Sequence, residues 1–152
     1  MKSPVSLRAL CVDDDDDNRE VLAILLQSWG LEVDAVATAT EAVLLNQTKR
    51  FDLYLLDSWL PDFDGLELCR RLRAEDPNAA VLFYSGAGFE VDRRRAIEAG
   101  ATAYVVKPDV EELQKVLTHF IANAERAIEN RAHLLSSAEA SRVLLPSFMV
   151  LN

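Results

Sequence analysis

The sequence is poor in cysteine, glycine and proline, and it has no long hydrophobic run. Its 152 residues include two cysteines and five each of glycine and proline. Cys11 and Cys69 are too few and too far apart for a disulfide framework or a zinc site, so we interpret both as reduced, structural thiols. No apolar stretch approaches the length that crosses a bilayer, and the opening residues lack the apolar segment of a secretory signal. These absences predict a cytoplasmic protein with no membrane partner.

The sequence also lacks an excess of basic residues. Sixteen Lys and Arg stand against 25 Asp and Glu, which gives a formal net charge of −9 at pH 7. A surface of this sign repels the phosphates of nucleic acids, so direct nucleic-acid binding is not expected. Half of the residues are hydrophobic, which at this length is enough for one core and short for two. We therefore expect one domain with an appendage.

Five short apolar runs alternate with segments of helical periodicity. Such alternation is typical of an α/β fold, in which helices connect the strands of a parallel sheet. The first expected helix ends at Gly30, and a fifth starts near residue 110. The three helices between them are expected at about 39–48, 66–74 and 90–99. The expected strands are residues 7–12, 31–37, 51–57, 79–85 and 101–107.

Polar side chains follow the ends of four of these strands. Asp13 and Asp14 end the first strand, Asp57 the third, Ser85 the fourth and Lys107 the fifth. The carboxyl ends of parallel strands lie along one edge of the sheet, where ligands bind, so these five side chains are expected to converge there. Three carboxylates repel one another, and a hard divalent cation such as Mg²⁺ is the common way to stabilise them. A hydroxyl and an ammonium beside it suit the oxygens of a phosphoryl group, and the central Asp57 is then a nucleophile that becomes an aspartyl phosphate.

The motifs at these positions resemble those of the receiver domain of two-component response regulators, over roughly residues 5–123. Their order and spacing on successive strand ends make the similarity specific. The resemblance implies a flavodoxin-like, doubly wound, five-stranded parallel sheet in the order 2-1-3-4-5 with five helices. The motifs are VDDD (12–15), LLDSWLPDFDG (55–65), the Ser-Gly pair at 85–86 and AGATAYVVKP (99–108).

The resemblance also implies how a phosphoryl group and a metal would be held. Asp57 would accept the phosphoryl group from a sensor histidine kinase or a histidine phosphotransfer protein, with Mg²⁺ as cofactor. Asp14 would bind the metal directly and Asp13 chiefly through water, and Asp57 would also be a metal ligand. The backbone carbonyl of Trp59 would be a further metal ligand.

Four other residues receive roles from the same resemblance. Lys107 would bind the phosphoryl group, and the hydroxyl of Ser85 would move to it as part of a switch. Tyr104 would be the aromatic switch residue, although an aromatic side chain in a parallel strand is most often a core residue. The bond between Lys107 and Pro108 would be cis, which X-Pro bonds alone allow at low cost. The switch would change the surface formed by the fourth helix, the fifth strand and the fifth helix.

Two positions concern the lifetime of the phosphoryl group. In receivers that resemble this chain, varied side chains occupy the position of Trp59, two residues after the phosphoacceptor, and help to set that lifetime. A large apolar ring there hinders the approach of water, and Ala87 offers no carboxylate or amide to orient it. These features predict slow self-dephosphorylation, the alternative being that Trp59 merely covers a loop.

Residues 13–17 are five consecutive aspartates. The resemblance assigns the first two to the metal. We interpret Asp15 and Asp16 as a solvated loop, and Asp17 as the N-cap of the first helix, where a carboxylate also favours the positive end of the helix dipole.

Two other functions remain open. An aspartate-nucleophile phosphohydrolase also uses Asp, Lys, Ser and Mg²⁺, but that family places a second acid where this chain has Trp59. A receiver-like interaction module would have lost phosphorylation while keeping the fold. We expect a phosphoacceptor signalling domain rather than an enzyme, because all five expected site residues are present: Asp13, Asp14, Asp57, Ser85 and Lys107.

The residues after the expected domain, 124–152, are predicted to form a helical tail. Ile121, Ile128 and Leu135 recur every seven residues, and Arg131 interrupts the pattern. We expect a homodimer through this tail or through the face of the fourth helix, fifth strand and fifth helix. The alternatives are a tail helix that folds back on its own domain and a disordered end. Two alanines, Ala124 and Ala138, occupy intervening positions on the same face of this helix. An apolar end follows, which consists of Leu144, Leu145, Phe148, Met149 and Val150.

Overall fold

The computed structural model describes residues 6–144, and the side chains of residues 6–139. Five strands form one parallel sheet in the order β2-β1-β3-β4-β5. The predicted fold class and sheet order are therefore confirmed. The strands are β1 (Arg8–Val12), β2 (Glu32–Val36), β3 (Leu53–Leu56), β4 (Ala80–Ser85) and β5 (Ala103–Val106). The helices are α1 (Asp16–Ser28), α2 (Ala39–Thr48), α3 (Gly65–Glu75), α4 (Glu90–Glu98) and α5 (Val110–Leu144).

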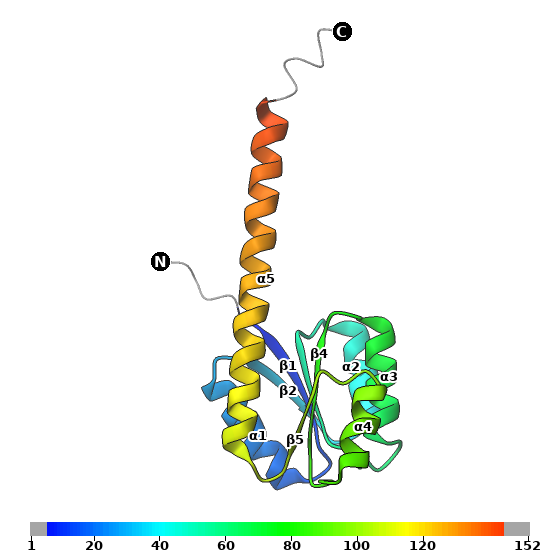
Figure 1. The fold of residues 1–152 in the computed structure, drawn as a ribbon. Coiled ribbons are helices and arrows are strands. Elements are labelled where there is room, and N and C mark those ends of the chain that lie inside the picture. Colours follow the sequence, from blue (N-terminus) through cyan, green and yellow to red (C-terminus); the bar gives the residue numbers. More distant parts are fainter. Residues whose placement is uncertain (1–5, 145–152) are drawn as a thin grey trace. The chain divides into compact units, whose positions relative to one another are not determined.

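Helices cover both faces of the sheet (Figure 1). α1 and the first turns of α5 lie on one face, and α2, α3 and α4 lie on the other. Successive side chains of a strand point to opposite faces, so a strand covered on both sides must be apolar throughout. All four residues of β3 are buried, as are the last four residues of β1. This explains why β3 and the last four residues of β1 are continuous apolar runs in the sequence.

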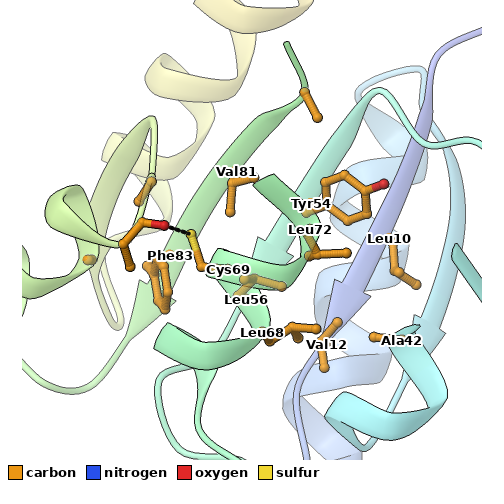
Figure 2. Close-up of a cluster of buried hydrophobic side chains, with 14 of the residues drawn as sticks. Leu10, Val12, Ala42, Tyr54, Leu56, Leu68, Cys69, Leu72, Val81 and Phe83 are labelled. Carbon is orange, nitrogen blue, oxygen red and sulfur yellow. Dashed lines mark hydrogen bonds between the residues drawn. The ribbon is translucent and has the colours of Figure 1, made fainter. Parts of the chain in front are cut away.

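The larger core fills the space between the sheet and helices α2, α3 and α4 (Figure 2). Burying a leucine or phenylalanine side chain contributes about 1.5–3 kcal/mol, so this cluster contributes a large share of the stability of the fold. On the opposite face, α1 and α5 contribute fully or nearly fully buried leucines, Leu22, Leu26, Leu113 and Leu117. The labelled core residues in Figure 2 are Leu10, Val12, Ala42, Tyr54, Leu56, Leu68, Cys69, Leu72, Val81 and Phe83.

The run of aspartates leads from β1 into α1. Asp15 is the N-cap, because its side chain accepts a hydrogen bond from the backbone N–H of Asn18 at 3.0 Å. The prediction that Asp17 caps this helix is therefore wrong by two residues. Asp16 and Asp17 lie in the first turn, where their charges still favour the positive end of the helix dipole. A run of identical side chains holds no local signal for the starting residue, and the short connection from the end of β1 decides it.

The chain divides into two units, residues 1–117 and residues 118–152, with the division inside α5. The predicted domain limits, 5–123 and 124–152, stay a prediction. The predicted apolar end from 145 to 150 lies outside the described residues. Within residues 6–144, no helix has the length and hydropathy that crossing a bilayer would require.

Both cysteines are buried thiols. Burial, the largest cause in each case, raises the pKa of Cys11 to about 12 and that of Cys69 to about 11. Because the thiolate is the reactive form, both thiols should stay protonated and unreactive toward a thiol reagent such as DTNB at about pH 8 in the folded protein. The chain unfolded in guanidinium should release two equivalents of chromophore. A rapidly reacting equivalent in the folded protein would contradict this expectation.

Gly65 begins α3 directly against the end of β3. A Cβ atom at this position would lie 2.2 Å from the carbonyl oxygen of Asp57 and 3.0 Å from the ring of Phe83. Because both neighbours are held in or beside central strands, Gly65→Ala should lower the free energy of unfolding by about 1–3 kcal/mol, measured by urea denaturation. Gly86→Ala is the matched control, since a Cβ there meets nothing within 4 Å. Equal losses in the two variants would show that the close contact is not the cause.

Candidate functional site

Three carboxylates converge at the carboxyl edge of the sheet. Asp13 and Asp14 follow β1, and Asp57 follows β3, which is paired with β1. One oxygen atom from each of the three side chains lies within 4.8 Å of the others. Asp13 is buried, Asp14 is exposed and Asp57 is half-buried. The structure thus brings together the three acidic residues that the sequence placed at strand ends.

Lys107 supplies a positive charge to this cluster from the end of β5. Its Nζ atom lies 2.8 Å from Asp13 Oδ2 and 3.5 Å from Asp57 Oδ2. Burial by itself would lower the pKa of Lys107, but the hydrogen bond to Asp13 and the charge of Asp57 outweigh it and raise that pKa. The ammonium is therefore retained as a fixed positive charge beside the carboxylates.

The carboxylate of Asp57 is held from one side. Its Oδ1 atom accepts a hydrogen bond from the backbone N–H of Ser58 at 2.8 Å, while Oδ2 faces Lys107. Burial raises the pKa of Asp57, and the charge of Lys107 opposes that rise.

A single ammonium close to three carboxylates leaves the cluster with an excess of negative charge. All of the converging acidic ligands are oxygen atoms, which is the donor set of a hard divalent cation. The cluster could therefore hold a metal ion.

Ser85 and Tyr104 both bond to Ala87, in the loop between β4 and α4. The Ser85 hydroxyl, which is fully buried, accepts a hydrogen bond from the N–H of Ala87 at 3.2 Å. The Tyr104 hydroxyl donates to the carbonyl oxygen of Ala87 at 2.5 Å, and its ring stacks on that of Phe83 with centroids 5.8 Å apart. Tyr104 is thus a packed core residue whose hydroxyl is also bonded to a loop beside the site.

Trp59 and Ala87 lie close to each other in space. Trp59 is 68% exposed, whereas Ala87 is buried. Both line a small hollow of about 150 Å³, together with Ser58 and Leu66. The peptide bond between Lys107 and Pro108 is cis.

Arg19 is a contributor to the site that the sequence reasoning missed. Its Nη1 atom donates to the carbonyl oxygen of Asp13 at 2.9 Å, and its Nη2 atom forms an ion pair with Asp16 at 2.5 Å. The guanidinium therefore fixes the backbone at the end of β1. Its place in the first turns of α1 was visible in the sequence, but no spacing rule assigns an arginine there to a carbonyl group.

Asp62 was also missed, although it anchors the loop that follows Asp57. Its carboxylate accepts hydrogen bonds from the backbone N–H groups of Ala39 at 3.0 Å and Thr40 at 2.7 Å, and from the Thr40 hydroxyl. Burial acts to raise the pKa of Asp62, but these hydrogen bonds outweigh it and hold that pKa well below its usual range. Asp62 thereby ties the loop that carries Trp59 to the first turn of α2. No local signal shows this, because the partners lie more than 20 residues earlier in the chain.

Comparison with known sequences bears on these observations. The model of the response regulator receiver domain family matches residues 9–118. The DNA-binding response regulator MtrA of Mycolicibacterium paratuberculosis (strain ATCC BAA-968 / K-10) is 32% identical over 132 residues, which are 87% of this chain and 57% of that protein. MtrA of Mycobacterium leprae matches to the same extent. The chain therefore spans little more than half the length of these curated relatives.

Solved structures agree with the sequence match. The chemotaxis response regulator CheY4 of Vibrio cholerae is 28% identical with a TM-score of 0.71, and the match covers 76% of this chain and 99% of that one. The receiver domain of the sensor histidine kinase PA1611 of Pseudomonas aeruginosa PAO1, solved with a magnesium ion coordinated in its active site cleft, is 30% identical with a TM-score of 0.70. That match covers 78% of this chain and 99% of the other. On the sheet order, the acidic cluster and these similarities together, the chain belongs to the family of response regulator receiver domains.

Proposed function

We propose that Asp57 accepts a phosphoryl group from the phosphohistidine of a sensor histidine kinase or a histidine phosphotransfer protein. The observation that carries this proposal is the position of the Asp57 carboxylate, which lies among Asp13, Asp14 and Lys107 at one edge of the sheet. A carboxylate used as a nucleophile needs such preorganised charge, because phosphoryl transfer depends mainly on positioning and electrostatic stabilisation.

The transfer exchanges one bond to phosphorus for another. An Asp57 oxygen attacks the phosphorus atom in line, the bond from phosphorus to the histidine nitrogen breaks, and the imidazole leaves and takes up a proton. The Lys107 ammonium, which already lies 3.5 Å from Asp57, binds an oxygen of the arriving group and offsets its charge. The Ser85 hydroxyl turns from the Ala87 N–H and donates to another phosphoryl oxygen.

The residues at the site fit Mg²⁺. The carboxylates of Asp13, Asp14 and Asp57 and the backbone carbonyl of Trp59 are the proposed ligands, with Asp13 acting chiefly through water. Bound Mg²⁺ supplies the positive charge that the carboxylates and the phosphoryl oxygens need beyond the single ammonium of Lys107.

The proposed output is a change in the surface formed by α4, β5 and the start of α5. Ser85 and Tyr104 both bond to Ala87, which precedes α4. When the Ser85 hydroxyl moves to a phosphoryl group, the Ala87 N–H loses its partner, so the loop and the position of the Tyr104 hydroxyl are biased toward a second arrangement. A downstream protein partner would read that surface.

Asp57 should be the only phosphorylated residue. With Mg²⁺ and acetyl phosphate, intact mass should show one phosphoryl group per chain, and none on Asp57→Asn or without metal, because the nucleophile or its neutralising charge is then missing. Asp17→Asn is the matched control, since Asp17 is an exposed carboxylate in the first turn of α1.

Three outcomes would overturn the assignment. A normal adduct on Asp57→Asn would exclude Asp57 as the acceptor. Repeated turnover of the phosphodonor without a lasting adduct would favour a phosphohydrolase, and neither adduct nor turnover in the presence of Mg²⁺ would favour an interaction module.

We further propose that Trp59 and Ala87 lengthen the life of the aspartyl phosphate. Both line the hollow that adjoins Ser58, the residue after the phosphoacceptor. An indole ring there obstructs the approach of water, and a methyl side chain cannot orient a water molecule for attack. The carbonyl of Trp59 is assigned to the metal, so this effect belongs to the ring alone.

Replacing either side chain by a polar one should shorten the phosphoryl half-life. Trp59→Asn removes the ring, and Ala87→Glu adds a carboxylate that can orient water, so dephosphorylation should speed up by about tenfold or more in each. The decay is measured by intact mass after the phosphodonor is removed. Phe89→Asn is the matched control, because Phe89 is 78% exposed on the loop that carries Ala87. Unchanged or longer half-lives in both variants would refute the shielding role.

A further inference from the structure

The second unit of the chain has an apolar face of its own. Residues 118–139 belong to one continuous helix, so side chains that recur at intervals of three and four residues share one face of it. We call the six positions of this face the seam. Five of the six seam residues are apolar and the sixth is an arginine: Ile121, Ala124, Ile128, Arg131, Leu135 and Ala138.

This face is exposed to water toward its far end. Leu135 of the seam is 60% exposed, and the neighbouring Leu134 is 69% exposed. Covering a leucine side chain removes apolar surface from water, and most of the stability of a helix in a protein comes from packing of such a face. Two adjacent exposed leucines therefore favour a partner that covers the seam.

We propose that the seam pairs with the seam of a second copy of this chain, in antiparallel orientation. Each seven-residue repeat has two seam positions: the first series is residues 121, 128 and 135, and the second is residues 124, 131 and 138. In an antiparallel pair of helices, a position of the first series in one helix meets a position of the second series in the other. Full overlap places Ile121 against Ala138 of the partner subunit, and Leu135 against Ala124 of the partner subunit. Each of these layers joins a large side chain to a small one, which fills the space without crowding.

The central layers contain the arginine. Full overlap places Ile128 beside Arg131 of the partner subunit, where the aliphatic stem can cover the isoleucine while the guanidinium reaches water. An in-register parallel pair would instead place Arg131 directly opposite Arg131 of the partner subunit. Among the side chains that the structure describes, Arg131 forms no ion pair that would neutralise this repulsion. The arginine therefore selects against the parallel arrangement.

Charge also favours this orientation. Residues 118–139 hold three acidic and two basic side chains, a net charge of −1, so −8 of the net charge of −9 lies elsewhere in the chain. The paired segment is about 33 Å long, and antiparallel pairing holds the two copies of Leu117 at its opposite ends. That separation exceeds the Debye length of about 8 Å at physiological ionic strength, so charges beside the two copies of Leu117 are screened from one another.

The 152-residue chain should be a dimer in analytical ultracentrifugation, with a mass twice its 16.9 kDa. Leu135→Glu should raise the dissociation constant by about 100-fold or more, because it buries an unpaired charge in the seam. Ser137→Glu is the matched control, since Ser137 is exposed on the opposite side of the helix and the added charge is the same. Both variants should keep the wild-type thermal unfolding of the receiver domain.

A monomer at all concentrations would overturn the dimer, and equal effects of the two variants would overturn the seam as its interface. The test is independent of phosphorylation, so failure of the proposed function would leave it unaffected.

The orientation is tested with the double variant Ile121→Cys/Ala138→Cys. After mild oxidation, peptide mapping should find position 121 linked to position 138. Links of 121 to 121 and of 138 to 138 would overturn the antiparallel arrangement. The native Cys11 and Cys69 are buried, so they do not compete.

Discussion

The charge balance at the carboxyl edge of the sheet is the constraint on which the site depends. Parallel strands bring Asp13, Asp14 and Asp57 together, where they repel one another. The ammonium of Lys107 reaches two of them across β4, and it offsets only part of their charge. Burial makes a negative charge on Asp57 costly, and this raises the pKa of the carboxyl group. A bound cation lowers the same cost, so burial also makes the cluster receptive to a cation. The fold thus produces a site that is ready for added positive charge.

Contacts to backbone groups hold the loops around the site. Asp62 attaches the loop after β3 to the first turn of α2, and Gly65 allows α3 to begin in contact with the carbonyl of Asp57. Arg19 holds the carbonyl of Asp13. On the other side, Ser85 and Tyr104 meet at Ala87 through one donor and one acceptor of the same residue. The Asp57 side of the site is therefore fixed by several contacts, whereas the loop before α4 is held to Ser85 and Tyr104 by two hydrogen bonds of Ala87.

The two units of the chain differ in the physics that governs them. The receiver buries apolar side chains on both faces of its sheet and carries most of the negative charge. In the second unit, residues 118–139 lie in a helix whose seam is apolar apart from Arg131 and whose charges nearly cancel. Like net charges on two receiver domains repel one another, while a helix of small net charge with exposed leucines gains from pairing. The tail therefore suits the proposed pairing of two copies better than the receiver does.

The sequence by itself determined the strands, the sheet order by resemblance, and the residues that converge on the site. Apolar runs that end in Asp13, Asp57, Ser85 and Lys107 carry this information locally, because the end of a parallel strand is also the edge of the site. Only the tertiary structure decided that Asp15 rather than Asp17 caps α1, since five identical side chains differ only in their distance from the strand. It also decided that Asp62 bonds to α2, and that Lys107 lies closer to Asp13 than to Asp57. Those contacts join segments about 20 to 95 residues apart, and their distances depend on how loops and strands pack rather than on any local pattern.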